Sequence, residues 1–307
     1  VTANAASVAS VAASVSQSRP TFFLGALGIR TFTAGAASAA SVARCALCVM
    51  GASGTTVTEG TSAQVQVSGA PAVVNSNGSP NLSLAASAKL QAPAVTIAGG
   101  TPSLGSGASI TPSPVVGAVI GDPLAGLAAP SVAGSATTYF SPFSGGSGSI
   151  GPGVYAGIYV FTGYTLTLNP GTYVMTGPLY NLGGTIQGTG VLVYLACTSY
   201  PAGCSGAGGH VNASAGTTTL TAASSGAYSG VAVFADRGDT ATNTVASGQL
   251  TVNGALYAVG MPLTLTQTGD SATVNGELIV SSLSLAASAQ LTVAPAGALP
   301  AAVRLSL

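Results

Sequence analysis

The residues of this sequence that could perform acid–base chemistry are few. Asp236 and Asp239 form its only close acidic pair, in the run D-R-G-D, and Arg237 between them is the only basic neighbour. Hydrolysis of a glycosidic bond requires two carboxylates, which β-helix enzymes surround with further acidic and basic residues. A pair with one arginine is more typical of a local ion pair or a turn cap. The sequence therefore predicts no catalytic residues and a protein that is not an enzyme.

His210 is the only histidine and lies in the run G-G-H. Ser-His-Asp and Cys-His sites both use a histidine base, so this residue is the single candidate for either. Its glycine-rich surroundings are more typical of a solvated loop. We therefore expect no nucleophilic site.

Four cysteines form two closely spaced pairs, Cys45 with Cys48 and Cys197 with Cys204. The spacing C-x-x-C occurs in redox motifs and in zinc sites. A redox motif would precede a helix of a thioredoxin-like unit, which is absent, and a zinc site would need the second pair or His210 to approach from about 150 residues away. The sequence therefore predicts two disulfides, no metal and no cofactor. Disulfides form in oxidising compartments, which indicates an extracellular or cell-surface protein.

Charge is sparse along the whole sequence. The 307 residues include six Lys or Arg and six Asp or Glu, 4% of the chain, and none of these lies between Asp122 and Asp236. Nucleic-acid and anionic-membrane binding need clustered basic residues, so both classes of partner are excluded. No run reaches the roughly 18 uninterrupted apolar residues of a membrane span. The sequence begins at Val1 without a methionine, and we interpret it as a processed or truncated product.

One short unit occurs twice, as L-S-L-A-A-S-A-K-L at Leu82–Leu90 and as L-S-L-A-A-S-A-Q-L at Leu283–Leu291. Each copy alternates apolar and polar residues around an Ala/Ser corner, as expected of short strands, whose side chains alternate with period two. Similar alternation fills most of the intervening chain. P-G-x-Y recurs after 18 residues and N-G-x-L after 22. The sequence is therefore first interpreted as a repeat protein.

A repeat of roughly 20 residues, with short strands and Gly, Asn and Ala/Ser corners, suits one coil of a parallel β-helix. We predict an all-β fold of this kind, right-handed, with a small N-terminal cap. The 201 residues between the two copies would then make about ten coils. A β-sandwich also has short strands and regular turns, and is the competing interpretation.

Composition divides the chain into four segments. We expect residues 1–43 to form an N-terminal cap or assembly segment, with a short helix at Thr21–Ile29. Residues 44–111 and 152–307 are predicted to form the two parts of the β-helix, the second ending in a C-terminal strand. Residues 112–151 are rich in Pro, Gly and Ser and have lost the pattern, so we predict an excursion or linker that lies across the rod.

Several stretches, in a fixed order, resemble one protein family. They are D-P-L-A-G-L from Asp122, P-G-V-Y-A-G-I-Y-V, T-L-T-L-N-P-G-T-Y-V-M and G-T-G-V-L-V-Y-L between Pro152 and Leu195, G-V-A-V-F-A-D-R from Gly230 and N-G-E-L-I-V-S-S-L-S-L from Asn275. Together they resemble the TadG-like proteins of bacterial tight-adherence (Tad) pilus-assembly systems. The resemblance covers nearly the whole chain. It implies a non-enzymatic, secreted or envelope-anchored domain that acts in pili or surface adhesion, with partners among pilus or cell-surface components.

Two other functions are compatible with an uncharged β-helix. A carbohydrate-binding or carbohydrate-cleaving protein would carry aromatic and acidic residues on one solvent face, and the sequence supplies the aromatic residues but not the acidic ones. An ice-binding protein would carry flat threonine arrays, and the arrays here are short and mixed with Tyr and Ser. The aromatic candidates are Tyr155, Tyr159, Tyr164 and Tyr173, and the threonine candidates are Thr165, Thr167, Thr217–Thr221, Thr264 and Thr266. We therefore favour a structural function.

Self-association is the last prediction from the sequence. A net charge of zero removes the repulsion between copies, and the ends of a solenoid expose strand edges. Apolar positions near both termini could pair with a neighbouring subunit as added strands. These positions are Val1, Val8, Val11, Val15, Val303, Leu305 and Leu307. We therefore expect a homopolymer, that is, a self-assembling filament subunit, with a pilus-associated adhesion domain as the alternative.

Overall fold

The computed structural model describes residues 10–20, 31–41, 45–134, 138–142 and 145–295 of the chain. The chain divides into two units, residues 1–44 and 45–307. In the first unit, β1 (Ser10–Pro20) and β2 (Thr31–Ser41) form an antiparallel pair. The predicted helix at Thr21–Ile29 lies outside the described residues, and the predicted capping role of residues 1–43 stays a prediction.

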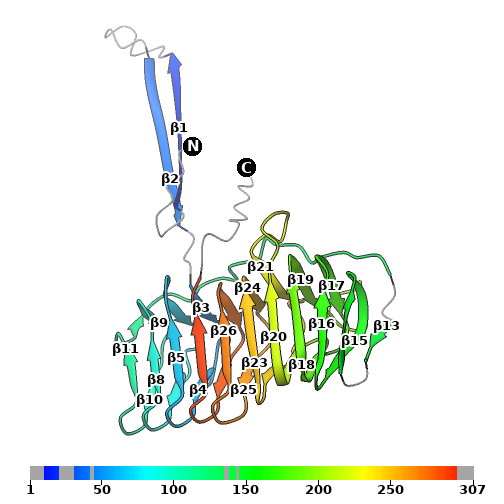
Figure 1. Ribbon diagram of the computed structural model, residues 1–307. Helices are drawn as coiled ribbons and strands as arrows, with labels where there is room; N and C mark the ends of the chain where they lie inside the picture. The colour runs from blue at the N-terminus through cyan, green and yellow to red at the C-terminus, as the bar shows by residue number, and fades with distance from the viewer. Residues whose placement is uncertain (1–9, 21–30, 42–44, 135–137, 143–144, 296–307) are drawn as a thin grey trace. The chain divides into compact units, whose positions relative to one another are not determined.

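The second unit is a solenoid in which the strands β3 to β29 form one continuous parallel sheet (Figure 1). Strands stack only on the equivalent strands of the coils before and after, which confirms the parallel β-helix and excludes the β-sandwich. The described residues contain no helix. Each coil has three faces, because its backbone turns at corners between short strands.

The first face consists of β15 (Gly153–Phe161), β17 (Gly171–Met175), β19 (Val191–Leu195), β21 (Val231–Ala235), β24 (Ala255–Ala258), β27 (Leu278–Val280), β3 (Leu47–Val49), β6 (Ala72–Val74), β9 (Val95–Ile97) and β12 (Val115–Val116). We call it the strap face, for the segment that crosses it.

The second face consists of β14 (Gly146–Ile150), β16 (Tyr164–Leu168), β18 (Leu179–Thr189), β20 (Val211–Thr221), β23 (Gly248–Asn253), β26 (Ser271–Val274), β29 (Gln290–Val293), β5 (Gln64–Val67), β8 (Lys89–Gln91) and β11 (Ser109–Thr111). We call it the hydroxyl face, for its outward side chains.

The third face consists of β13 (Thr138–Phe140), β22 (Asn243–Val245), β25 (Leu263–Leu265), β28 (Leu283–Leu285), β4 (Val57–Glu59), β7 (Leu82–Leu84) and β10 (Ser103–Leu104), together with parts of β15, β18 and β20. These last three strands bend around corners and so contribute to two faces each.

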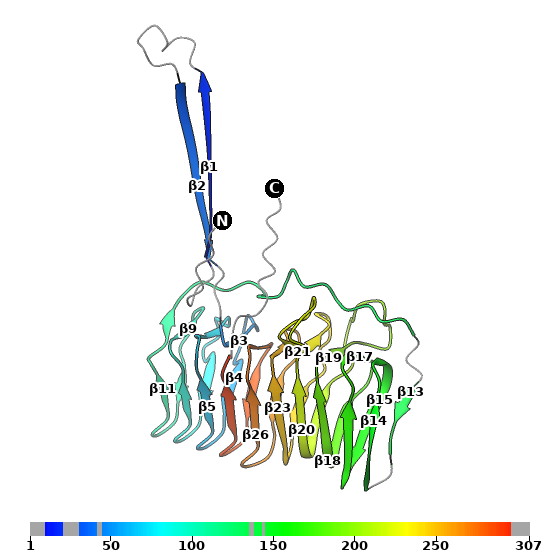
Figure 2. The ribbon, with the colours of Figure 1, turned by 45° about the horizontal axis from the view of Figure 1, so that its top comes forward.

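The order of the coils in space differs from their order in the sequence. The last strands of the described residues, β27 to β29, pair with the first solenoid strands, β3 to β5. The chain therefore enters the solenoid in the middle, winds to one end at β12, returns to the other end at β13, and winds back to the middle (Figures 1 and 2). We call the contact between β27–β29 and β3–β5 the seam.

The seam corrects the prediction that about ten coils separate the two L-S-L-A-A-S-A copies. Leu283 pairs with Val57, and Val57 pairs with Leu82, so the copies lie only two coils apart with a single coil between them. The sequence separation is large because the chain travels to both ends of the solenoid between the two copies.

The repeated unit is explained by the corner between the third face and the hydroxyl face. In both copies the serine adopts a left-handed conformation, with φ 60° at Ser87 and 56° at Ser288. The alanine that follows donates a turn hydrogen bond to the residue three before it, Ala88 to Ala85 at 3.1 Å and Ala289 to Ala286 at 3.2 Å. Both of these alanines are fully buried, since larger side chains would not fit inside the corner.

The core is built from columns of inward-facing side chains, one from each coil. One column runs Leu166, Ile186, Thr218, Leu250, Ala272, Leu291, Val65, Leu90 and Ile110. All of these residues are buried. Burial of each large aliphatic side chain contributes about 1.5–3 kcal/mol to stability.

Two predicted surface aromatics lie in this core instead. Tyr173 is 0% exposed and Tyr155 is 8% exposed, and their rings stack with centroids 5.9 Å apart. The Tyr173 hydroxyl, a single donor, lies within hydrogen-bond distance of the carbonyl oxygens of Asn169 and Ile150, at 2.7 and 2.8 Å, and burial raises its pKa to about 12. The solvent aromatic face that the carbohydrate-binding alternative would need therefore lacks these two tyrosines.

One carboxyl group lies in the core without a partner. The Glu59 side chain faces inward between Leu285 and Leu84 of the neighbouring coils and is 1% exposed. Neither of its carboxylate oxygens has a hydrogen-bond partner. Burial raises its pKa from 4.5 to about 8, because an apolar surrounding disfavours the charged form.

Residues 117–134, which we call the strap, return the chain along the solenoid from β12 toward β13 (Figure 2). The predicted linker at 112–151 is therefore an excursion that also contains β12, β13 and β14. Leu124, with Ile120, Leu127 and Val132, packs against the outward side chains of the strap face. The strap adds a second apolar layer to this face alone.

Candidate functional site

The acidic pair of the sequence is used for structure. Asp236 accepts hydrogen bonds from the backbone N–H groups of Cys204 and Gly238 and from the Tyr194 hydroxyl, at 3.1, 2.9 and 2.9 Å. Asp239 is 0% exposed and accepts from the N–H groups of Gly208 and Ala241 through Oδ1. The predicted turn cap is thus present, while a hydrolytic pair needs access to substrate and water that Asp239 lacks.

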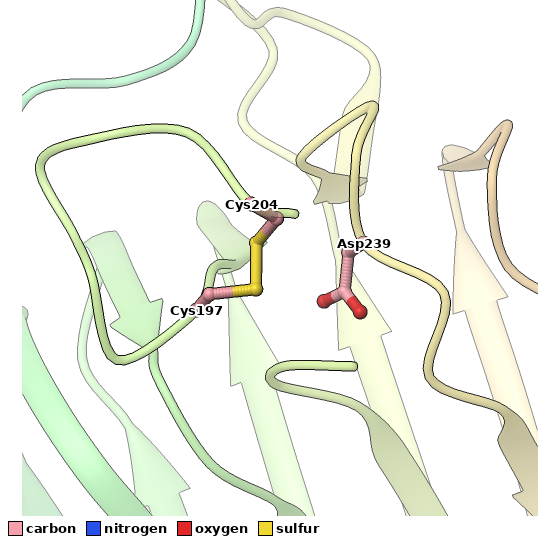
Figure 3. Close-up of side chains that lie close together, drawn as sticks. All are labelled: Cys197, Cys204 and Asp239. Atoms are coloured by element: carbon pink, nitrogen blue, oxygen red, sulfur yellow. A yellow bond between two sulfur atoms is a disulfide. The ribbon is translucent and has the colours of Figure 1, made fainter. Parts of the chain in front are cut away.

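Both predicted disulfides are present, Cys45–Cys48 and Cys197–Cys204. Figure 3 shows the second one beside the carboxyl group of Asp239, whose Oδ2 has no hydrogen-bond partner. Burial raises the pKa of this carboxyl group. The two sulfur atoms are bonded to each other and so are not thiolate ligands, and the cluster is a closed structural corner.

His210 lies next to this loop and is partly buried. Its Nδ1 is 3.2 Å from the carbonyl oxygen of Gly208, and its own carbonyl oxygen accepts from the backbone of Leu179. The histidine is therefore part of the ordered corner before β20 rather than a solvated loop residue.

Arg237 does not pair with its neighbours in D-R-G-D, as the sequence suggested, but with the strap. Its Nε is 3.0 Å from Oδ2 of Asp122, and its Nη2 donates to the carbonyl oxygens of Leu124 and Leu127. The guanidinium also lies over the rings of Phe234 and Tyr257, 5.6 and 5.4 Å from their centroids. This arginine fastens the middle of the strap.

The hydroxyl face carries the candidate site. Along each of its strands, two outward polar side chains flank one inward position, as Thr165 and Thr167 flank the buried Leu166. Because the strands stack in register, these side chains form two rows that run along the solenoid. Stacked strands lie about 4.8 Å apart, and alternate residues of one strand about 6.6 Å apart, so the two rows form a regular grid.

The first row is Ser147, Thr165, Thr185, Thr217, Gln249, Ser271, Gln290, Gln64, Lys89 and Ser109. The second row is Ser149, Thr167, Gln187, Thr219, Thr251, Thr273, Thr292, Gln66, Gln91 and Thr111. Lys89 is the single charged side chain in these described rows. The rest are hydroxyl and amide groups, which both donate and accept hydrogen bonds.

One part of this face is hollowed. A hollow of about 500 Å³ is lined by side chains of the second row and by residues of the adjoining corner. Its lining residues are Thr167, Leu168, Asn169, Pro170, Gln187, Gly188, Thr189, Thr219 and Thr221. Nε2 of Gln187 donates to Oγ1 of Thr167 at 3.2 Å, which orders the two side chains across neighbouring coils.

An amide ladder borders the hollow on the corner side. Nδ2 of Asn253 donates to Oγ1 of Thr221 at 3.0 Å, and Nδ2 of Asn275 donates to Oδ1 of Asn253 at 2.8 Å. Groups bonded in this way hold fixed orientations before any ligand arrives, which lowers the entropy cost of binding. The hollow therefore combines many neutral donors and acceptors with an ordered border.

Other predicted surface residues lie elsewhere. Tyr159 and Tyr180 form an aromatic pair on the third face, with ring centroids 6.0 Å apart. Thr264 also faces outward there, and Thr266 donates to the carbonyl oxygen of Val245 at a corner. Tyr164 lies on the hydroxyl face, with its ring edge against Phe140. The structure thus distributes the aromatic and threonine candidates over both of these faces.

The glutamines of the rows were missed by the sequence analysis. Gln64 and Gln66 show the same spacing of two as the threonines, and this spacing was the signal that could have found them. Their place in a row depends on the seam, which the sequence alone did not reveal.

Comparisons with protein-family models, with curated proteins and with solved structures found no match for this chain. Among the described residues, no helix is long and apolar enough to cross a membrane.

Proposed function

We propose that this chain is a non-enzymatic, extracellular adhesion domain of the bacterial surface whose hydroxyl face binds a neutral polysaccharide. The resemblance to TadG-like proteins of Tad pilus systems supports a pilus-associated setting. Two disulfides are compatible with an oxidising compartment. The rows of the hydroxyl face are the observation that carries the proposal.

The chemistry of the rows favours a neutral, hydroxyl-rich ligand. Sugar hydroxyls donate and accept hydrogen bonds, as do Thr, Ser and Gln side chains, whereas an anionic ligand would need several basic residues and these rows hold only Lys89. Each neutral hydrogen bond contributes only about 0.5–1.5 kcal/mol net, so affinity has to come from many contacts along an extended chain. A polysaccharide lying along the rows can make such contacts.

Ice is the second candidate, because Thr219, Thr251, Thr273 and Thr292 occupy one row in four successive coils. The glutamines argue for polysaccharide instead. Gln187 interrupts this row at the hollow, and Gln249 and Gln290 interrupt the other row. Long amide side chains break the flatness of a threonine array but can reach the hydroxyl groups of a sugar.

The test is binding of the full chain to insoluble cellulose, mannan and cross-linked dextran, against an anionic polysaccharide. We expect Gln187→Ala with Thr219→Ala to weaken neutral-polysaccharide binding at least tenfold, since two hydrogen-bonding side chains in the hollow are lost. Thr264→Ala with Ser284→Ala on the third face is the matched control and should bind as the wild type does. Both doubles should change the free energy of unfolding by less than about 0.5 kcal/mol per substitution, because the residues are on the surface.

Several results would contradict the proposal. They are an absence of binding to all three neutral polysaccharides, equal binding by the hollow variant, or a stronger interaction with the anionic polysaccharide. Inhibition of ice recrystallisation by the wild type, lost in Thr251→Lys, would assign the face to ice instead.

A further inference from the structure

The two ends of the solenoid expose strand edges. At one end, β10, β11 and β12 each pair with a strand of the preceding coil, and no described strand pairs with their other edge. At the opposite end, β13 and β14 are bonded to β15 and β16 in the same one-sided way. An open edge presents unpaired backbone groups that a further strand can bind.

The core is also open at the β10–β12 end. Leu104 and Val116 continue the inward columns of Leu84 and Ile97, which are buried. Leu104 is nevertheless 50% exposed and Val116 66% exposed, because no described coil covers them. Covering such side chains is favourable by about 25 cal/mol per Å² of apolar area.

The β13–β14 end offers the complementary surface. Its inward residues Phe140 and Ile150 are only partly buried and pack against the core, while Tyr139 is 66% exposed. No Asp, Glu, Lys or Arg occurs between residues 122 and 236, so this end lacks the charged side chains that usually protect edges. Prolines at the other end, such as Pro102 and Pro112, flank the edge strands but do not lie within them.

The seam demonstrates the contact that the two ends could make. There, β27, β28 and β29 pair in register with β3, β4 and β5, although no loop joins one coil to the next at this point. The third-face and hydroxyl-face strands of the two ends run in the same direction as those at the seam, because every pair in the solenoid is parallel. A coil of this protein therefore stacks on another coil without a covalent connection.

We propose that copies of this chain stack head to tail, with β10 and β11 of one copy pairing with β13 and β14 of the next. Leu104 of the first copy would then be covered by the inward residues of the second. This contact joins two different surfaces, so it does not close and it generates a filament. The rows of the hydroxyl face would continue from copy to copy.

This joint differs from the one predicted from the termini. Val11 and Val15 lie in β1, which is already paired with β2, so this strand has one partner within its own chain. Val1, Val8, Val303, Leu305 and Leu307 lie outside the described residues. The solenoid ends are the better-supported place for the joint.

The test measures the mass of the full-length wild type by light scattering over a concentration series, with electron microscopy of the same samples. We expect mass to rise with concentration and the microscopy to show unbranched filaments with a solenoid-width cross-section. Leu104→Asp with Val116→Asp should raise the dissociation constant at least tenfold, because two carboxylates would replace the exposed apolar side chains of the β10–β12 end. Both side chains are exposed in the monomer, and an unchanged thermal transition checks the fold.

Filament length in mixtures of wild type and double variant is the second measurement, and it also applies if the variant polymerises weakly. Leu104→Asp/Val116→Asp retains a free β13–β14 end, so a few per cent of it added to wild type should shorten the filaments by capping them. Val119→Asp changes a strap residue that is 63% exposed, and should leave assembly unchanged. A wild type that is monomeric at all concentrations, a double variant that assembles normally, or loss of assembly on Val11→Asp with Val15→Asp would each overturn the proposal.

Discussion

The strap face and the hydroxyl face are built on the same coils but have opposite outward chemistry. On the strap face one outward column runs Val154, Val174, Tyr194, Phe234, Tyr257, Ile279, Cys48 and Val73. On the hydroxyl face the corresponding positions are Thr, Ser and Gln, with the single exception of Lys89. The first face is covered by the strap, and no described segment forms such a layer on the second. Outward side chains, rather than the backbone, therefore decide where a solenoid gains a further layer.

The two faces and the core also differ in what forms hydrogen bonds with their polar groups. Under the strap, Asp122 accepts from Arg237 at 3.0 Å and from the Tyr257 hydroxyl at 2.6 Å, so its charge is neutralised and bonded. Burial and the hydrogen bond to Asp122 raise the pKa of Tyr257, which stays protonated and remains a donor. On the hydroxyl face water can solvate the side chains. Inside the coils, Glu59 has neither kind of partner.

Removing the Glu59 carboxyl group should have the largest effect. Its folded-state pKa of about 8 lies above the unfolded value of 4.5, so the protonated form favours folding. The contribution to stability is full below about pH 4.5 and is lost as pH rises through 8, and the difference amounts to about 5 kcal/mol by linkage. Glu59→Leu, matching Leu84 and Leu285, should therefore raise the free energy of unfolding at pH 9 and remove this pH dependence.

Urea unfolding of wild type and Glu59→Leu between pH 4 and pH 9 measures this effect. Glu59→Gln is the control, since it keeps a polar group in the core but cannot ionise, and its stability should vary less with pH than that of the wild type. A wild type with equal stability at pH 5 and pH 9 would show that the carboxyl group is hydrated or paired in solution.

Cutting the fastening of the strap should have the next largest effect. Arg237→Met removes the ion pair with Asp122, two hydrogen bonds to strap carbonyl groups and the contacts with two aromatic rings. We expect a loss of roughly 2–4 kcal/mol in the free energy of unfolding. Proteolysis of the strap between residues 117 and 134 should become faster, and mass spectrometry of the fragments measures it.

Arg237→Lys is the matched variant, because it keeps the charge but lacks the planar fork that reaches Asp122 and the carbonyl groups together. Its stability should fall between those of wild type and Arg237→Met. If Arg237→Met leaves both stability and cleavage unchanged, the apolar contacts of Leu124 and its neighbours hold the strap without the arginine.

Opening the Cys197–Cys204 disulfide should have a smaller effect on the same face. Tyr200, within this loop, exchanges hydrogen bonds with the backbone of Val132 in the strap, at 2.7 and 3.1 Å. Closure of a loop of about eight residues contributes roughly 2–3 kcal/mol in the chain-entropy model. The double change to serine should lower the free energy of unfolding by this amount and expose the strap near Val132 to proteases.

The Cys45–Cys48 pair provides the comparison for that prediction. It closes a shorter loop, of about four residues, so the same model gives it a contribution of about 2 kcal/mol. The free energy of unfolding of its double serine variant should be slightly higher than that of the Cys197/Cys204 variant. Protease cleavage near Val132 should be the same in this variant as in the wild type. If the Cys45/Cys48 variant were instead the less stable of the two, loop length would not set the contribution of each disulfide. Packing around the cysteines would then outweigh chain entropy.

Local features of the fold could be predicted from the sequence because they depend on residues that lie close together in the chain. The alternation around L-S-L-A-A-S-A predicts two strands and a corner, and the structure places both strands and the left-handed serines there. The short spacing of each cysteine pair likewise predicted the disulfides. These signals depend on the period of a strand and on short-range closure, which the sequence records directly.

The order of the coils and the composition of the site could not be predicted in this way. Any coil with inward aliphatic residues can stack on any other. The residues around Leu283 and Val57 therefore do not show that these two strands pair. The rows of the hydroxyl face depend on that order. The pairing of Arg237 with Asp122 also spans 115 residues, and only the isolation of these two charges at the borders of the uncharged region hinted at it.

The seam determines the order in which the coils can pair while the chain is being synthesised. The ribosome releases β3 to β5 before it makes either arm of the solenoid, and their partners β27 to β29 follow only after both arms have been made. Until then the early coils keep an open edge, and strand pairing between residues so distant in the chain is slow. A chain cut short anywhere before Leu278 would leave that edge without its partner. The pairing of β27–β29 with β3–β5 is therefore the folding step that joins the two arms into one continuous solenoid.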